Sequence, residues 1–209
     1  MESQENLFDA GMLLYEDSQY SEAIDFFKPA ADAGHLLAAE KLANCYNRSG
    51  SVELAIPYWE ICRKANNHSA NTNYAGYLKE IPGSQDLAMQ LWRDAADAGI
   101  PQAAFNLGVW LKNLGQVEEG KVLLQKSGEL GYTDGYFVLA GIYYRAQEWD
   151  AMKEALKPLI ALADPRAQQI LAAYQETIDR PQTSHITRPR QYGNVFRVED
   201  PTNTGISSV

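Results

Sequence analysis

The sequence predicts an all-α fold: a right-handed α/α superhelix of about five helical hairpins plus a capping helix, with a non-helical C-terminal tail. The first observation is a unit of 32 or 33 residues that recurs along most of the chain. The second is that equivalent positions of each unit hold small and bulky residues in the same order. Because one hairpin cannot bury its own apolar face, the copies must stack on one another.

Each expected first helix carries a small residue that lets the second helix of its hairpin approach closely. This residue recurs as Gly11, Ala43, Gly76, Gly108, Ala140 and Ala172. Twelve residues after the first five of these stand Ala23, Ala55, Ala88, Gly120 and Met152. Four residues later the chain has Phe27, Trp59, Trp92, Leu124 and Leu156. This pattern predicts hairpins in which the small residue of the first helix lets the two backbones approach, and the small residue of the second helix receives the bulk of the first.

The end of each hairpin is also marked. Eleven residues beyond the second small residue stand Gly34, Asn66, Gly99, Gly131 and Ala163. Three of the five are glycine, which is the residue most common just after a helix. The last copy, from Pro165 to Ile178, has one helix, and we interpret it as a cap over the end of the stack.

Two segments and two shorter pairs of residues are typical of a known family. The segments are Ala-Ala-Asp-Ala-Gly-His at 30–35 and Ala-Ala-Asp-Ala-Gly-Ile at 95–100, and the pairs are Leu107-Gly108 and Leu139-Ala140. At these positions the chain resembles the Sel1-like repeats, relatives of the tetratricopeptide repeats, over roughly residues 4 to 178. The resemblance implies an α/α solenoid and a role as an adaptor. The third copy departs from the pattern, with Ala75-Gly76 in place of Leu-Gly.

The composition changes near Asp179, so we divide the chain into a helical repeat domain at 1–178 and a basic, proline-containing tail at 179–209. From Arg180 to Val198 the tail has four arginines and no acidic residue. It could dock on the repeat domain, dock on a partner, or remain free.

Charge and composition limit the classes of partner. The net charge of -9 argues against binding to nucleic acid or to an anionic membrane and favours basic partners. The acidic amino terminus and the absence of a long apolar run predict a cytoplasmic protein without a signal peptide or membrane span. Cys45 and Cys62 lie among apolar neighbours, and we interpret them as reduced core thiols.

The sequence contains no pattern typical of catalysis. Its three histidines, His35, His68 and His185, lack the spacing of a metal site, and acidic pairs such as Glu118-Glu119 fall on expected helix surfaces. We therefore expect no catalytic residue, no metal and no cofactor.

A peptide or protein partner is the ligand that the sequence favours. If tetratricopeptide geometry applies, the first helices line a groove, and aromatic residues alternate there with amides and charges. The candidate partner-binding residues are Phe8, Tyr15, Asn44, Asn73, Tyr77, Phe105, Val109, Lys112, Phe137, Tyr144 and Arg145. The alternative for any one aromatic residue is that it packs between neighbouring helices.

Three functions are therefore open. The favoured one is a non-catalytic interaction module, an adaptor or scaffold that binds its partner in the groove. The second is a bacterial immunity-type protein that binds and neutralises a toxin. The third, which no spacing of residues supports, is an enzyme or small-ligand-binding protein with a site at the mouth of the groove. The sequence leaves the oligomeric state open.

Overall fold

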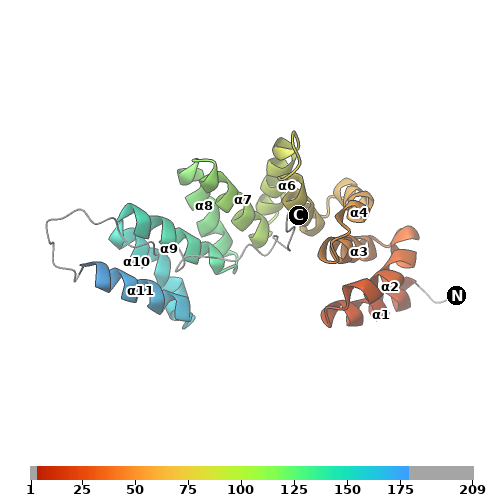
Figure 1. The fold of residues 1–209 in the computed structure, drawn as a ribbon, viewed down its shortest axis with the longest axis horizontal. Coiled ribbons are helices and arrows are strands. Elements are labelled where there is room, and N and C mark those ends of the chain that lie inside the picture. The colour runs from red at the N-terminus through yellow and green to blue at the C-terminus, as the bar shows by residue number, and fades with distance from the viewer. Residues whose placement is uncertain (1–3, 179–209) are drawn as a thin grey trace. The chain divides into compact units, whose positions relative to one another are not determined.

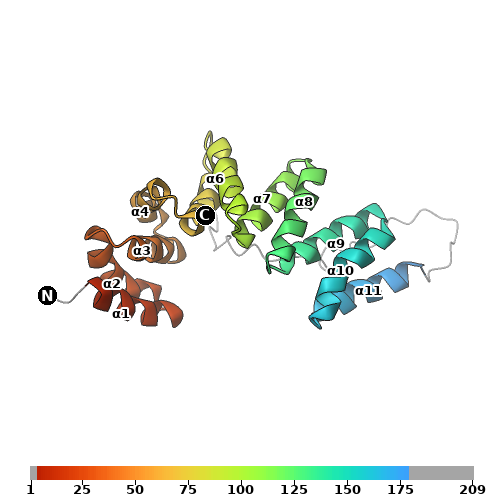
Figure 2. The same cartoon turned by 180° about the vertical axis from the view of Figure 1, so that it is seen from behind.

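The computed structural model describes residues 4–178, which form α-helices and turns and contain no strand (Figures 1 and 2). The helices are Gln4–Glu16 (α1), Tyr20–Asp32 (α2), Leu36–Arg48 (α3), Val52–Lys64 (α4), His68–Leu78 (α5), Gln85–Asp97 (α6), Pro101–Asn113 (α7), Val117–Glu129 (α8), Asp134–Ala146 (α9), Trp149–Ala161 (α10) and Pro165–Ile178 (α11). The predicted all-α fold of five hairpins and a capping helix is confirmed. The tail predicted at 179–209 lies outside the described residues.

The described residues divide into two compact units between Ala98 and Gly99, within the repeat domain predicted at 1–178. Unit 1, residues 4–98, contains the hairpins α1–α2, α3–α4 and α5–α6. Unit 2, residues 99–178, contains α7–α8, α9–α10 and the single helix α11. Within each unit, the helices of neighbouring hairpins pack against one another.

Within each unit, the second helix of a hairpin packs on its own first helix and on the first helix of the next hairpin. Helix α2 contacts α1 and α3, and α8 contacts α7 and α9. First helices of successive hairpins also contact one another, as α3 with α5 and α9 with α7 and α11. We call the exposed side of the first helices the A-helix surface: α1, α3 and α5 in unit 1, and α7, α9 and α11 in unit 2.

Contacts between the small residues of the first helices and the bulky residues of the second helices hold the hairpins together. The bulky residues Phe27, Trp59, Trp92, Leu124 and Leu156 are at most 1% exposed. A Cβ atom added to Gly11 would lie 2.7 Å from the ring of Phe27. In α7–α8, a Cβ on Gly108 would lie 3.0 Å from the carbonyl oxygen of Gly120. The two backbones therefore approach more closely there than side chains would allow.

The third hairpin differs from the predicted register. Helix α5 has 11 residues where the other first helices of hairpins have 13, so the extra residue of this copy lies in the turn at 79–84. Ala75 is fully buried, whereas Gly76 is partly exposed. The buried small residue is therefore Ala75, one position before the Gly76 that the repeat spacing indicated.

Every helix from α1 to α10 is followed by one residue with a positive φ. These residues are Ser18, Gly34, Gly50, Asn66, Gly83, Gly99, Gly115, Gly131, Gln147 and Ala163. They include all five hairpin ends predicted from the sequence. In nine of these ten cases the left-handed residue lies within two residues of the helix end, whereas Gly83 lies in the longer turn after α5. This conformation is costly for residues other than glycine.

The first prediction concerns Ala163, whose φ is 55°. Ala163→Gly should stabilise the protein by about 1 kcal/mol, because glycine adopts this conformation without the steric cost of a Cβ atom. The same change at Ala172, an exposed residue inside α11, should destabilise by about 1 kcal/mol because glycine is the poorer helix former. Urea unfolding measures both effects, and a shift of the same sign in the two variants would contradict this assignment.

The second prediction concerns Gly120. Gly120→Ala should destabilise by about 1 to 3 kcal/mol, because the added Cβ would lie 2.8 Å from the carbonyl oxygen of Gly108. Alanine is normally the better helix former by about 1 kcal/mol, so a loss of stability would itself report the clash. Val122→Ala, on the exposed side of the same helix, is the control and should change stability by no more than about 0.5 kcal/mol.

Candidate functional site

The A-helix surface of unit 1 begins with Phe8 on α1, which is half-buried. Its ring stacks on the imidazole of His35, with 4.8 Å between ring centroids, and lies 5.8 Å from the ring of Phe27. His35 caps α3, because its Nδ1 accepts a hydrogen bond of 3.1 Å from the backbone N–H of Ala38. Phe8 is thus held from one side by the junction of the first two hairpins.

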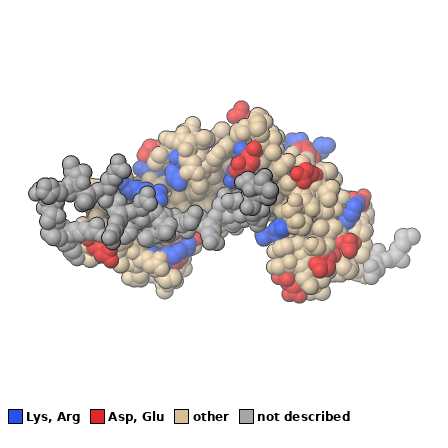
Figure 3. Space-filling view, in the orientation of Figure 1, with Lys and Arg blue, Asp and Glu red and all other residues tan. Residues whose placement is uncertain are grey.

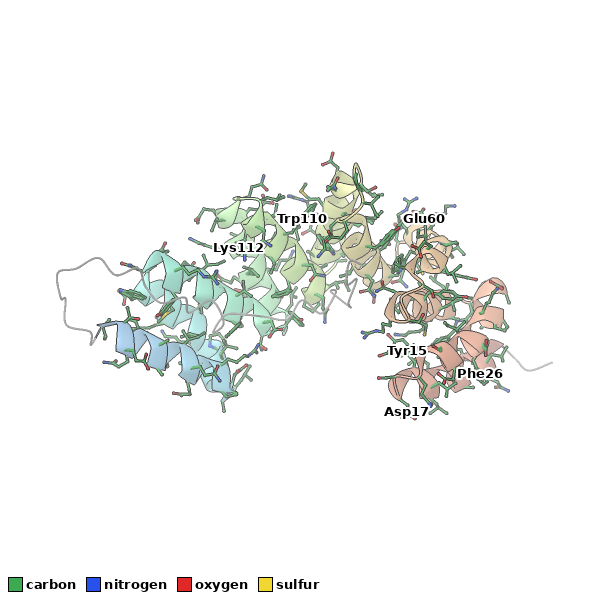
Figure 4. All side chains as sticks on the ribbon, viewed as in Figure 1. Tyr15, Asp17, Phe26, Glu60, Trp110 and Lys112 are labelled. Atoms are coloured by element: carbon green, nitrogen blue, oxygen red, sulfur yellow. The ribbon has the colours of Figure 1, made fainter. Side chains whose placement is uncertain are left out.

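Tyr15 lies in the last turn of α1, on the same surface as Phe8 (Figure 4). Its ring contacts Tyr20, with 5.3 Å between centroids, and the Nζ of Lys41 lies 5.3 Å from its centre. Burial raises the pKa of the Tyr15 phenol, and the nearby Arg48 guanidinium opposes this shift. The sequence did not single out Lys41, and the cation stacked on the ring is visible only in the fold.

The junction of α3 and α5 is polar. The amide of Asn73 donates a hydrogen bond of 2.8 Å to Oδ1 of Asn44. One turn earlier in α3, Glu40 accepts hydrogen bonds from Asn67 and Ser69, at 2.8 and 3.1 Å. Asn44 is only 7% exposed, so it serves to join the two hairpins, while Asn73 stays partly exposed.

Tyr77 on α5 is the third ring on the surface of unit 1. It lies against Trp59, with 5.8 Å between ring centroids, and 6.5 Å from Tyr74. Trp59 is fully buried and Tyr74 is nearly so, whereas Tyr77 is partly exposed. The ring of Tyr77 therefore has rigid neighbours on one side and solvent on another.

In unit 2, Phe105 and Phe137 are core residues. They are 5% and 3% exposed, and Phe105 packs against Tyr132 with 5.0 Å between ring centroids. The guanidinium of Arg166, which is paired with Asp134 and Asp164, lies 5.0 Å from the ring of Phe137. Phe105 and Phe137 therefore pack between neighbouring helices, which is the alternative to partner binding that the sequence left open for each aromatic residue. Their buried rings offer little surface to a partner.

The other candidate residues of unit 2 are accessible. Val109, Lys112 and Tyr144 are half-buried, and Arg145 is exposed. The hydroxyl of Tyr144 lies 2.9 Å from that of Thr177 in α11. Lys112 lies near the end of α7 (Figure 4), and its pKa is lowered by burial and by the positive charge of Arg145.

Groups typical of catalysis or metal binding are not gathered in the described part of the chain. Among residues 4–178, no three His, Cys, Asp or Glu side chains are placed to hold a metal ion. Cys45 and Cys62 are buried free thiols, and burial raises the pKa of each to about 12. Within the same residues, no helix has the length and apolar character needed to cross a membrane.

Comparison with known proteins identifies the fold. No family model matches the sequence, and no curated protein matches it either. Solved structures do match. A Sel1 repeat protein from Oxalobacter formigenes has 19% identity and a TM-score of 0.56, with 84% of this chain and 86% of that one covered. The Pseudomonas aeruginosa PilF structure has 16% identity and a TM-score of 0.67, with the same coverage. A tetratricopeptide-repeat protein from Thermus thermophilus has 16% identity and a TM-score of 0.55, covering 84% and 99%.

The third prediction separates core residues from surface residues. Phe105→Ala and Phe137→Ala should each destabilise unit 2 by about 3 kcal/mol, because each leaves a cavity in a packed core. Leu114→Ala, at a position 57% exposed, should stay within about 0.5 kcal/mol. Chemical denaturation of the three variants provides the measurement. Equal unfolding midpoints for all three would place the two phenylalanines outside the core.

Proposed function

We propose that this chain, which has the fold of Sel1-like and tetratricopeptide-repeat proteins, is a non-catalytic interaction module. In this proposal a peptide or protein partner binds to the A-helix surface, and the chain acts as an adaptor or scaffold. The residues assigned to the contact are those that are at least partly exposed: Phe8, Tyr15, Asn73, Tyr77, Val109, Lys112, Tyr144 and Arg145.

The proposal depends most on three aromatic rings of unit 1 that are packed on one side and accessible on the other. Phe8, Tyr15 and Tyr77 are each packed on one side against a neighbouring ring and remain partly exposed. A ring that is already held in place loses little conformational entropy when a partner covers its exposed part. Such rings commonly contribute most of the binding free energy of an interface.

The charge of unit 1 favours a basic partner there. Residues 4–98 contain 7 basic and 14 acidic side chains, whereas residues 99–178 contain 7 and 9. Figure 3 shows acidic side chains distributed over the drawn face of unit 1. An excess of negative charge increases the rate at which a basic partner associates, and this effect weakens as the salt concentration rises.

The experiment that tests this proposal begins with capture of the partner from lysate on the immobilised full chain, followed by identification and recombinant production. In titrations with that partner, the double variant Phe8→Ala/Tyr77→Ala should weaken binding by at least about 30-fold, because a single anchoring ring already contributes about 2 kcal/mol. Circular dichroism would verify that the variant is folded.

The matched control removes exposed apolar side chains from a second helix of the same unit. Leu54 and Ile61 on α4 are 55% and 46% exposed, and the variant Leu54→Ala/Ile61→Ala should change affinity less than about twofold. The opposite ranking of the two double variants would place the partner on the second helices and contradict the proposal.

A further inference from the structure

Among residues 4–178, the outer face of α4 is more apolar than that of any other second helix. We define the outer face of a second helix as the residues one before, two after and six after its small residue. In α4 it comprises Leu54, Pro57 and Ile61. All three are exposed, and the exposed fractions of Leu54 and Ile61 are 55% and 46%. Because they lie three and four residues apart, they form one continuous apolar stripe along the helix.

The other second helices carry charge at the same positions. The corresponding residues are Glu22, Asp25 and Pro29 in α2, Leu87, Gln90 and Asp94 in α6, Glu119, Val122 and Lys126 in α8, and Ala151, Glu154 and Pro158 in α10. Each of these four sets has at least one charged side chain, as is usual for a helix surface that faces water. The outer face of α4 has none. Single exposed apolar residues are ordinary, but a contiguous stripe marks a surface that contacts another protein.

Opposite charges flank the two ends of this stripe. Glu53 lies in the first turn of α4 and Lys64 in the last, and both are exposed. Within the described part of the chain neither forms an ion pair. The carboxylate of Glu60, which the charge of Lys64 also reaches, is held by Arg63 and by the hydroxyl of Tyr74. Glu53 and Lys64 are separated by close to three full turns, so they lie on the same side of the stripe.

From these observations we infer that two copies of this chain associate through the outer face of α4, with the two α4 helices antiparallel about a twofold axis near Tyr58. Such an axis places Leu54 of one copy beside Ile61 of the other, within one residue's rise of ~1.5 Å along the helix. It places Glu53 of one copy beside Lys64 of the other in the same way. The twofold rotation keeps both charges on the same side of the stripe, so they meet.

A second copy is the occupant that the charges favour. A surface that pairs with itself across a twofold axis must be complementary to itself. The apolar stripe of α4 then meets an apolar stripe, and the acid at one end of the helix meets the base from the other end. The antiparallel arrangement also brings the positive N-terminus of each helix dipole near the negative C-terminus of the other.

This association goes beyond the proposed function and does not depend on it. It uses a second helix and leaves the A-helix surface of each copy open to a partner. A contact made by one pair of helices is smaller than a standard protein interface. We therefore expect a weak dimer, with a Kd on the order of 100 µM.

Sedimentation velocity of the full chain, from about 5 to about 500 µM, tests the association. The sedimentation coefficient should rise with concentration from that of a monomer toward that of a dimer. Leu54→Asp and Ile61→Asp should each weaken the dimer at least about 30-fold, because twofold symmetry makes every substitution act twice. Val122→Asp, at a position of α8 that is 68% exposed, is the control and should leave the equilibrium unchanged. Circular dichroism verifies that each variant is folded.

Charge reversal tests the antiparallel geometry. Glu53→Lys and Lys64→Glu each place like charges at both ends of the contact, and each should weaken the dimer about fivefold at low salt. The double variant Glu53→Lys/Lys64→Glu exchanges the charges and should dimerise like the unchanged chain. Fluorescein-labelled Glu53→Lys titrated with unlabelled Lys64→Glu should form a mixed dimer of the same affinity, because opposite charges then meet at both ends.

Three results would overturn this inference. One is a monomer at every concentration, and another is a dimer that Ile61→Asp leaves intact. The third is a mixed dimer no tighter than the dimers of the two single charge variants, which would exclude the antiparallel pairing. The proposed function is judged separately, because Ile61→Asp should change affinity for the captured partner less than about twofold, whereas Phe8→Ala/Tyr77→Ala should weaken it and leave the dimer unchanged.

Discussion

The tight packing of small and bulky residues between the two helices of each hairpin is the constraint on which the rest of this structure depends. At α7–α8 the two backbones approach so closely that both helices need glycine, since a Cβ on either Gly108 or Gly120 would lie 3.0 Å or less from the other's carbonyl oxygen. Leu124 packs against the same point and is fully buried. Because each hairpin is held in this way, its first helix presents a fixed face, and the side chains on that face are preorganised.

The sequence predicted the repeats well because their signals are local and recur. Small residues, bulky residues and left-handed helix ends fall at fixed spacings, so one copy supports the next. Where a copy has an extra residue, the predicted position of the small residue is displaced by one. In the third copy the repeat spacing indicated Gly76. The extra residue lies in the turn after α5, so Ala75 is the buried residue. Counting from one helix to another cannot tell which segment carries an insertion.

The candidate site was less predictable from sequence because the exposure of an aromatic ring depends on the neighbouring hairpin. Phe8 and Phe105 occupy equivalent positions of their repeats, yet Phe8 is half-buried and Phe105 is 5% exposed. Phe105 belongs to the core cluster of unit 2 and packs against Tyr132 in the turn before α9, whereas Phe8 stacks on His35 in the turn before α3. The effect of Arg145 on Lys112 likewise arises from contact between α7 and α9, which the sequence spacing does not reveal.

In the proposed function the first helices, and not the second helices, bind the partner. Hydrogen–deuterium exchange of the full chain, with and without the captured partner, distinguishes the two sets of helices. The partner should slow exchange most strongly in α1, α3, α5, α7 and α9. Protection confined to α2, α4, α6, α8 and α10, with unchanged exchange in the first helices, would contradict it.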